Sequence, residues 1–366
     1  MAIATRQRRR RISRSKRRLK GQRAGLRNHM AGYAPHGLVR RPDGRGGEGL
    51  FAARALPEGF SIECPARFVL SERRAAGTPF GRRLRRRMRA AGRAPPTGRD
   101  LLYVTLADAR LDARSPFYAY AAALPYPGVD AGSWGRAEAD ALLGGTPLLA
   151  AVRAGDEALA RLAARVRPFA PHVTCGDLAW ARGMLWSRGF EAGFDGGAAT
   201  TAYVPFLDFL NHEESAQVAI SRAGRAAPLR FANARPLAEG EEATITYGAG
   251  RSNGELLLAY GFAFPGNEND VCNLVGGKAA DVADCALKAD GVLPPALWRK
   301  LSSADPPARG DVERLALALQ EGFLALDRHD RSAAAPGNAA DYAKIYRDGQ
   351  RAILRAAMGT CIKMLT

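Results

Sequence analysis

The chain has 366 residues, 47% of them hydrophobic, which suffices for one large or two medium domains and excludes a wholly disordered chain. Its net charge is +18, from 54 Lys or Arg against 36 Asp or Glu. The excess lies in two segments, so a basic face for DNA along the whole chain is not indicated. No run of about 18 apolar residues occurs, and the sequence therefore predicts no membrane-spanning helix and no membrane partner.

The first basic segment, residues 1–42, contains 14 Lys or Arg and no acidic residue. We expect residues 1–36 to form a tail outside the fold, because a block of like charges repels itself. The Arg-rich, acid-poor composition of this tail is typical of a transit peptide, but equally of a nuclear-localisation or RNA-contacting tail. Contact with nucleic acid is not expected outside this tail.

Short strands open the folded part of the chain. Residues 50–54 and 60–63 flank Pro57-Glu58-Gly59, a pattern that predicts a β-hairpin. The second basic segment, residues 73–99, holds ten Arg and no acidic residue, and its Leu84 and Met88 lie four positions apart, as on an exposed helix. Its one aromatic residue is Phe80, and a single aromatic is too few to stack a series of bases, so a solvated helical face is favoured over an RNA-binding patch.

A mixed helical region spans about residues 100–190, and a second group of strands follows it. Thr174 and Asp177 form a predicted capping box at the start of a helix. Strand-like residues at 229–234 and 243–247 are separated by turn residues. Ser252-Asn253-Gly254-Glu255 caps another helix that Gly261 is placed to end, and helical spacing dominates thereafter. This order predicts an α+β fold with an all-helical C-terminal domain.

Three segments carry more glycine or polar residues than packing requires. The loop at residues 44–50 has four glycines in seven positions, which lets backbone approach a ligand closely, although a tight turn explains it equally well. Asp208, Asn211 and His212 lie beside an apolar run and need partners if they are buried. Tyr247 ends a strand before a glycine, which core packing also explains. The chain has no H-x-x-x-H motif, and its five cysteines form no C-x-x-C pair. We therefore expect no metal site, no disulfide scaffold and a reducing compartment.

Taken in this order, the motifs closely resemble those of the SET-domain methyltransferases. They are most similar to the branch that contains the Rubisco large-subunit lysine methyltransferase and the actin-histidine methyltransferase. The match runs from the glycine-rich strand start through residues 208–212 and 239–248 to Tyr260-Gly261-Phe262. It includes Ser187-Arg188-Gly189-Phe190 in the middle and Tyr346-Arg347 near the end, and it covers roughly residues 37–358.

The resemblance implies a pseudoknotted, β-rich SET domain at residues 37–268 with a helical insert at about 110–195. A helical substrate-binding domain at residues 269–366 would follow it. The implied cofactor is S-adenosylmethionine, and the implied partner is a non-histone protein presenting a lysine. Tyr247 is implied as the catalytic residue, and Phe190 and Asp208 as substrate-binding residues. The implied cofactor-binding residues are Gly46, Gly47, Glu48, Arg188, Asp208, Asn211, His212, Tyr260, Gly261 and Phe262.

Two features bear on the substrate, one that distinguishes members of the family and one that departs from the family pattern. Phe190 stands two positions after Arg188, as in lysine-directed relatives, whereas the histidine-directed relative has a smaller polar residue there. Glu213-Glu214 replaces a small residue found in many relatives, so we expect an acidic channel mouth suited to a basic peptide.

Two alternatives stay open. One is a protein-histidine N-methyltransferase, and the other is a catalytically inactive SET-fold protein that contacts nucleic acid through its Arg-rich tail. The protein is expected to be a monomer. We expect it in the plastid if residues 1–36 are a transit peptide, and in the nucleus or cytoplasm otherwise.

Overall fold

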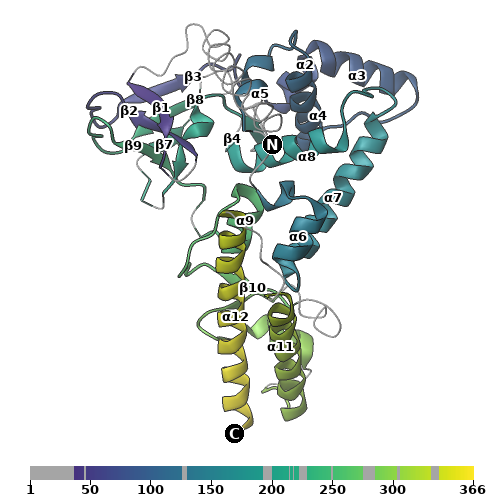
Figure 1. Cartoon of the computed structure of the whole chain (residues 1–366), viewed down its shortest axis with the longest axis vertical. Coiled ribbons are helices and arrows are strands. Elements are labelled where there is room, and N and C mark those ends of the chain that lie inside the picture. Colours follow the sequence, from purple (N-terminus) through teal and green to yellow (C-terminus); the bar gives the residue numbers. More distant parts are fainter. Residues whose placement is uncertain are drawn as a thin grey trace, which may run out of the picture. The chain divides into compact units, whose positions relative to one another are not determined.

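The structure, a computed structural model, divides into two compact units (Figure 1). The first unit comprises Met1–Tyr126 and Arg161–Ala249, and the second comprises Pro127–Ala160 and Gly250–Thr366. Part of the predicted helical insert thus belongs to the same unit as the C-terminal helices. The basic tail at residues 1–36 and Gly46 lie outside the described residues. The described residues are 37–44, 47–125, 130–192, 200–213, 215–216, 218–221, 229–248, 250–274, 285–302, 306–330 and 338–366.

Short strands build the sheets of the first unit. The first sheet has the order β1 (Leu38–Pro42), β2 (Glu48–Ala52), β9 (Glu242–Ile245) and β6 (Asn211–His212). The second has the order β3 (Ser61–Cys64), β8 (Leu229–Asn233) and β7 (Val218–Ser221). β4 (Gly189–Ala192) pairs with β5 (Thr200–Tyr203). With the helices below, this is a mixed fold of the predicted α+β class.

The predicted hairpin around Pro57-Glu58-Gly59 is wrong, although the turn itself is present, with Gly59 at φ 74°. β2 pairs with β1 and β9, whereas β3 pairs with β8, so the chain turns a corner from one sheet to the other. Leu56 in this corner exchanges two backbone hydrogen bonds of 2.9 Å with Leu237, which lies in the equivalent corner between β8 and β9. The reason is burial, because both leucines are only 2% exposed and a surface hairpin would leave them in water.

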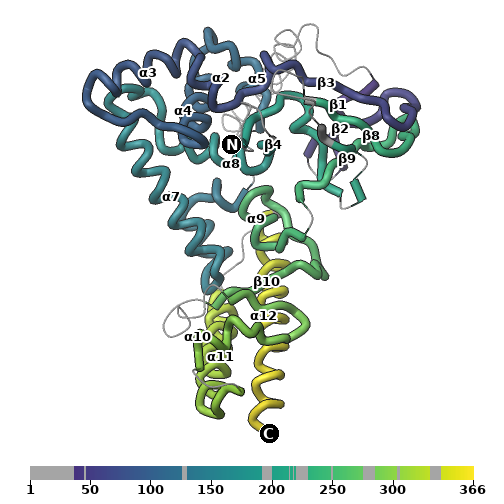
Figure 2. Tube along the Cα trace, turned by 180° about the vertical axis from the view of Figure 1, so that it is seen from behind, coloured from purple at the N-terminus to yellow at the C-terminus, as the bar shows by residue number. Residues whose placement is uncertain are grey.

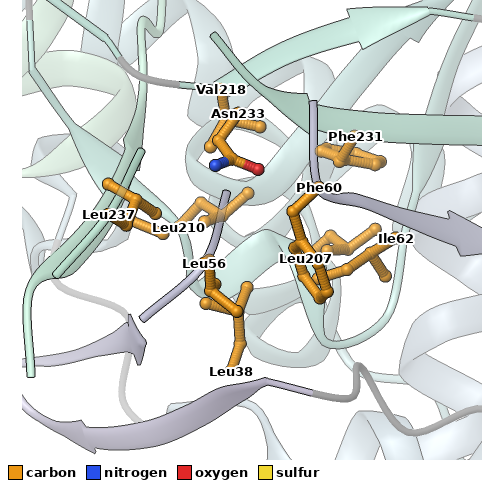
Figure 3. A pocket seen from close by; sticks show the side chains of 11 residues that line it. Leu38, Leu56, Phe60, Ile62, Leu207, Leu210, Val218, Phe231, Asn233 and Leu237 are labelled. Carbon is orange, nitrogen blue, oxygen red and sulfur yellow. The ribbon is translucent and has the colours of Figure 1, made fainter. Parts of the chain in front are cut away.

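The two corners close an apolar interior between the sheets of the first unit (Figure 3). Leu56 and Leu237 point into it together with Leu207, Leu210 and Phe231. The cavity left among these side chains is only ≈ 20 Å³, room for about one water molecule. This interior supports the segment that leads from Leu207 into β6.

Helices form the rest of the first unit, and α8 begins at the predicted capping box of Thr174 and Asp177. α3, predicted as an exposed helix, instead buries Phe80, Leu84 and Met88 and exposes most of its arginines. Its sequence is therefore amphipathic, and the apolar positions decide which face packs. The helices are α2 (Glu72–Gly77), α3 (Pro79–Ala90), α4 (Gly98–Leu111), α5 (Tyr118–Ala123), α8 (Cys175–Arg188) and the short η2 (Leu207–Phe209). α7 (Pro147–Val166) contributes to both units.

The second unit is mainly helical. Its longest helices, α11 (Arg309–Asp330) and α12 (Asn338–Leu365), run side by side (Figures 1 and 2) and bury leucines such as Leu315, Leu319 and Leu354. The capping box of α9 (Asn253–Tyr260) is confirmed, as is Gly261 at its end, with φ 78°. The predicted all-helical domain also contains one short strand pair, β10 (Val271–Cys272) with β11 (Leu287–Lys288). The other elements are η1 (Ala131–Ser133), α6 (Arg136–Leu143) and α10 (Pro295–Leu301).

Within the described residues, no helix combines the length and apolar character needed to cross a membrane. The same part of the chain contains no group of three or more His, Cys, Asp or Glu side chains arranged to hold a metal ion.

Candidate active site

A parallel strand pair brings two distant parts of the sequence together in the first unit. β6 lies parallel to β9, with Asn211 opposite Thr244 and His212 opposite Ile245. The pairing continues into a backbone hydrogen bond of 3.1 Å from Glu213 to Ile245. Tyr247 lies two residues beyond the end of β9 and emerges beside His212.

Tyr247 is held at both its backbone and its phenol. Its backbone N–H donates to Nδ1 of His212 at 3.1 Å, and its hydroxyl donates to the carbonyl oxygen of Leu210 at 3.0 Å. The Tyr247 and His212 rings stack with centroids 5.3 Å apart and 26° between their planes. Because Nδ1 accepts from a backbone amide, that nitrogen carries no proton. The phenol therefore has a defined position, with its proton directed at Leu210.

Asn211 lies at the start of β6 among acidic side chains. Its Nδ2 donates to Oε1 of Glu242 at 2.6 Å and to Oδ2 of Asp43 at 3.4 Å. A Cβ atom on Gly49 would come within 2.2 Å of Glu242 Oε1 and 2.9 Å of Asn211 Nδ2. Glycine at position 49 thus leaves the space in which these two side chains meet over β2, and a larger residue would displace them.

The glycine-rich loop is the turn between β1 and β2. The Gly47 backbone N–H donates to Oδ1 of Asp43 at 2.9 Å, which ties the loop to the same acidic group. Asp43 and Glu242 give this end of the sheet a negative character that suits a positively charged ligand.

Arg188, at the end of α8, lies against the segment that precedes β6. Its guanidinium carbon is 4.7 Å from the ring centroid of Phe209, and Arg40, which pairs with Glu48, lies 3.7 Å from the same ring. Nη1 of Arg188 donates to the backbone carbonyl of Asp208 at 2.7 Å. The Phe209 ring therefore contacts both Arg188 and Arg40, and Arg40 in turn pairs with Glu48.

Asp208 is buried, with 4% exposure. Its Oδ2 accepts the Tyr120 hydroxyl at 2.9 Å, and Oδ1 has no hydrogen-bond partner among the described residues. Burial raises the pKa of the Asp208 carboxyl, and the positive charge of Arg188 acts against that shift. Burial also raises the pKa of Tyr120 well above its ordinary value. Sequence reasoning missed Tyr120, because a tyrosine among alanines carries no signal that separates it from core packing.

The remaining predicted residues are Phe190 in the first unit and Tyr260, Gly261 and Phe262 in the second. Phe190, in β4, is 9% exposed and makes an edge contact with Phe231, with ring centroids 5.4 Å apart. Tyr260, Gly261 and Phe262 belong to the second unit, where the two aromatic rings lie 6.3 Å apart. The ligand contacts expected of these residues stay predictions, as does the contact expected of Asp208.

Comparison with known proteins identifies the fold. No protein-family model matches the chain, and no curated protein matches it. Solved structures do match, among them the SET domain of LSMT bound to lysine and AdoHcy, with a TM-score of 0.72 and 16% identity over 95% of this chain and 91% of that chain. Rubisco LSMT bound to AdoMet matches with a TM-score of 0.72 and 17% identity, over 95% of this chain and 92% of that chain. Rubisco LSMT bound to sinefungin and monomethyllysine matches with a TM-score of 0.71, 17% identity and the same coverage.

Proposed function

We propose that this chain, whose fold is that of the SET domain of Rubisco LSMT, is an S-adenosylmethionine-dependent protein-lysine N-methyltransferase that acts on a non-histone protein. The observation that carries the proposal is the arrangement of Tyr247, fixed beside His212 by two hydrogen bonds at the end of the β6–β9 pair. Solved structures of this fold hold AdoMet or AdoHcy, and some hold lysine or monomethyllysine.

The cofactor-binding residues of the first unit in this proposal lie at and near the turn between β1 and β2. Asn211, His212 and the backbone at residues 46–48 would hold S-adenosylmethionine, with Arg188 beside Asp208 and Phe209. Tyr260, Gly261 and Phe262 are further cofactor-binding residues that the family resemblance implies. The residues fit such a ligand, because Asp43 and Glu242 flank Asn211 and carboxylates favour a molecule that carries sulfonium and ammonium charges. When bound, the cofactor supplies an electrophilic methyl group.

Tyr247 would orient the acceptor amine. Its hydroxyl proton is directed at the Leu210 carbonyl, so the phenolic oxygen keeps lone pairs that accept an N–H from the incoming amine. An amine held in this way has its own lone pair free for attack, which is the in-line geometry that methyl transfer needs. A carbonyl oxygen is too weak a base to take up the phenolic proton, so this hydrogen bond favours an orienting role over a proton relay.

A lysine must lose its proton before it reacts. With a pKa of about 10.4, presenting the neutral amine at pH 7 costs about 4.6 kcal/mol. Apolar and aromatic surroundings lower that cost by disfavouring the ammonium form, and the half-buried His212 and Tyr247 rings provide such surroundings.

The finer architecture belongs to the same proposal. A pseudoknotted SET domain would span residues 37–268 with its insert at about 110–195, and residues 269–366 would bind the protein substrate. The chain would act as a monomer.

The test is to incubate the full chain with radiolabelled S-adenosylmethionine and a cell extract, and then to map the labelled residue by mass spectrometry. We expect label on a lysine. Tyr247→Phe should lower the rate at least about 100-fold while cofactor binding stays intact, because the reacting amine is no longer positioned. Tyr118→Phe, at a tyrosine that is 37% exposed, is the matched control and should behave as wild type.

Two results would overturn the proposal. Label on a histidine would assign the histidine-directed activity instead. Absence of label from every extract, together with salt-dependent binding of nucleic acid by the same preparation, would point to a catalytically inactive binding protein.

A further inference from the structure

Tyr120 lies on α5 and hydrogen-bonds to Asp208 in the segment that precedes β6. Nothing in its sequence context marks it as functional. From the geometry we infer that Tyr120 is a positioning residue for Tyr247, acting through Asp208 and the short helix η2. This inference rests on the proposed methyl transfer, in which Tyr247 orients the acceptor.

The first link is the hydrogen bond between two buried side chains. Tyr120 is fully buried and Asp208 is 4% exposed, and they meet at 2.9 Å. A hydrogen bond to a carboxyl group in such surroundings is strong, because no water competes for it. The bond ties α5 to the middle residue of η2.

The second link is the strained backbone that η2 carries. Phe206, directly before η2, has φ 76°, and it is the only residue other than glycine with a positive φ among the described residues. A bulky side chain disfavours this conformation, so it persists only where neighbouring contacts hold it. Asp208 supplies those contacts, since Arg188 binds its backbone carbonyl at 2.7 Å while Tyr120 binds its carboxyl group.

The third link runs from η2 to the catalytic phenol. The Leu210 backbone N–H donates to the carbonyl of Leu207 at 3.1 Å, which closes the turn. The Leu210 carbonyl then receives the Tyr247 hydroxyl at 3.0 Å. Anchoring Asp208 therefore sets the position of the oxygen that aims Tyr247. In this arrangement Asp208 acts through the backbone.

The structure offers a matched control for Tyr120. Tyr203 is also fully buried, its hydroxyl donates to the Ala181 carbonyl at 2.8 Å, and its ring lies 6.2 Å from that of Tyr120. Removing the hydroxyl from Tyr203 deletes one buried hydrogen bond of similar length, but none that reaches η2.

The experiment compares Tyr120→Phe with Tyr203→Phe in the full chain. We expect Tyr120→Phe to lower kcat about tenfold, to leave the KM for S-adenosylmethionine unchanged and to shift the ratio of mono-, di- and trimethylated product, because the amine is less well oriented. Both variants should lower Tm to a similar extent, because each loses one buried hydrogen bond. Tyr203→Phe should keep kcat within about twofold of wild type and leave the product ratio unchanged. Equal kcat values and product ratios for the two variants would overturn the inference.

A second variant covers a failure of Tyr120→Phe to fold. Asp208→Ala removes the acceptor of the same bond as well as the charge facing Arg188, and it should lower kcat at least as much. In a double-mutant cycle, adding Tyr120→Phe to Asp208→Ala should lower kcat no further, because both variants break one link. Additive losses would contradict the inference.

A readout without turnover separates this inference from the proposed function. The ¹⁵N chemical shift of His212 Nδ1 reports its hydrogen bond from Tyr247, so Tyr120→Phe should move it and Tyr203→Phe should not. If wild type transfers no methyl group but the shift responds in this way, the proposed function fails and the positioning link stands. If wild type is active but the shift and kcat respond alike to both variants, the positioning link fails alone.

Discussion

Asp208 in the first unit and Asp270 in the second are both buried aspartates, but their carboxyl groups are satisfied differently. Both Asp270 oxygens accept hydrogen bonds from Asn253, one from the backbone N–H at 2.9 Å and one from Nδ2 at 3.1 Å. Asp208 accepts from Tyr120 on one oxygen, and the other has no partner among the described residues. Burial raises the pKa of both carboxyl groups.

The difference separates a carboxylate that stabilises the start of a helix from one that, in our proposal, serves the candidate site. Asp270 caps the first turn of α9, where backbone N–H groups lack helical partners and negative charge is favoured. α12 also packs closely there, since a Cβ atom on Gly349 would come within 2.6 Å of the Asp270 carboxylate. One oxygen of the Asp208 carboxyl group has no hydrogen-bond partner among the described residues, and Asp208 lies two residues before Leu210, whose carbonyl accepts the hydroxyl of Tyr247, the residue we propose as catalytic. A fully satisfied buried group indicates stability, and a half-satisfied one beside a site indicates function.

The largest expected effect comes from Asp270→Asn. An amide has only one acceptor oxygen. The NH₂ group of the new asparagine would therefore face one of the two Asn253 N–H donors whose hydrogen bonds the carboxylate accepts in wild type. We expect the free energy of unfolding to fall by about 2–3 kcal/mol, measured by urea denaturation. A change below about 0.5 kcal/mol would show that Asp270 is not the structural carboxylate that its contacts indicate.

The same substitution at Asp208 should have a smaller effect. Asp208→Asn keeps an acceptor for Tyr120, and its NH₂ group faces no donor among the described residues. We expect the free energy of unfolding to change by less than about 1 kcal/mol. Loss of the charge facing Arg188 should lower kcat about threefold, since the backbone anchor stays. A loss above about 100-fold would instead mean that the carboxylate touches the cofactor or the substrate directly.

The smallest expected effect is on the pH dependence of stability, compared between wild type and Asp208→Asn. Burial raises the pKa of the Asp208 carboxyl above its ordinary value of 3.8, so the native state holds the proton more tightly than the unfolded state. The contribution of Asp208 protonation to the free energy of unfolding is fully present below pH 3.8. It is lost as pH rises through the raised native pKa, and the free energy of unfolding then falls by at most about 1.4 kcal/mol per pH unit. Denaturation of wild type and Asp208→Asn should therefore show the stability of wild type falling relative to the variant as pH rises above about 4. A constant difference would contradict the assignment.

Sequence reasoning succeeded where the signal was local. Both capping boxes and the terminating Gly261 depend on residues within one or two turns, and all are confirmed. It failed for strand pairing, because residues 50–63 predict a turn but not which strands the turn joins. The partners of β2 and β3 are chosen by burying Leu56 against Leu237, a contact that no short window contains.

The candidate site divides in the same way. Asn211, His212 and Tyr247 could be named from the order of the motifs, and the structure brings them together. Tyr120 and Gly49 could not be singled out. Their importance lies in one hydrogen bond across the first unit and in one close approach over β2. The hydrogen bond of Tyr120 leaves no pattern in the sequence, and the glycine-rich loop at residues 44–50 does not show which of its glycines allows the close approach.

The pairing of Leu50 with Ala243 also has a consequence for biosynthesis. β2 leaves the ribosome early, yet its partner β9 follows on the order of 10–40 s later at typical rates of translation. During that interval one edge of the β1–β2 ribbon stays open to other chains, and such edges promote aggregation. Contacts this distant also slow folding. We therefore expect the nascent protein to depend on chaperones until translation has passed Tyr247, and amino-terminal fragments that stop earlier to be insoluble and inactive.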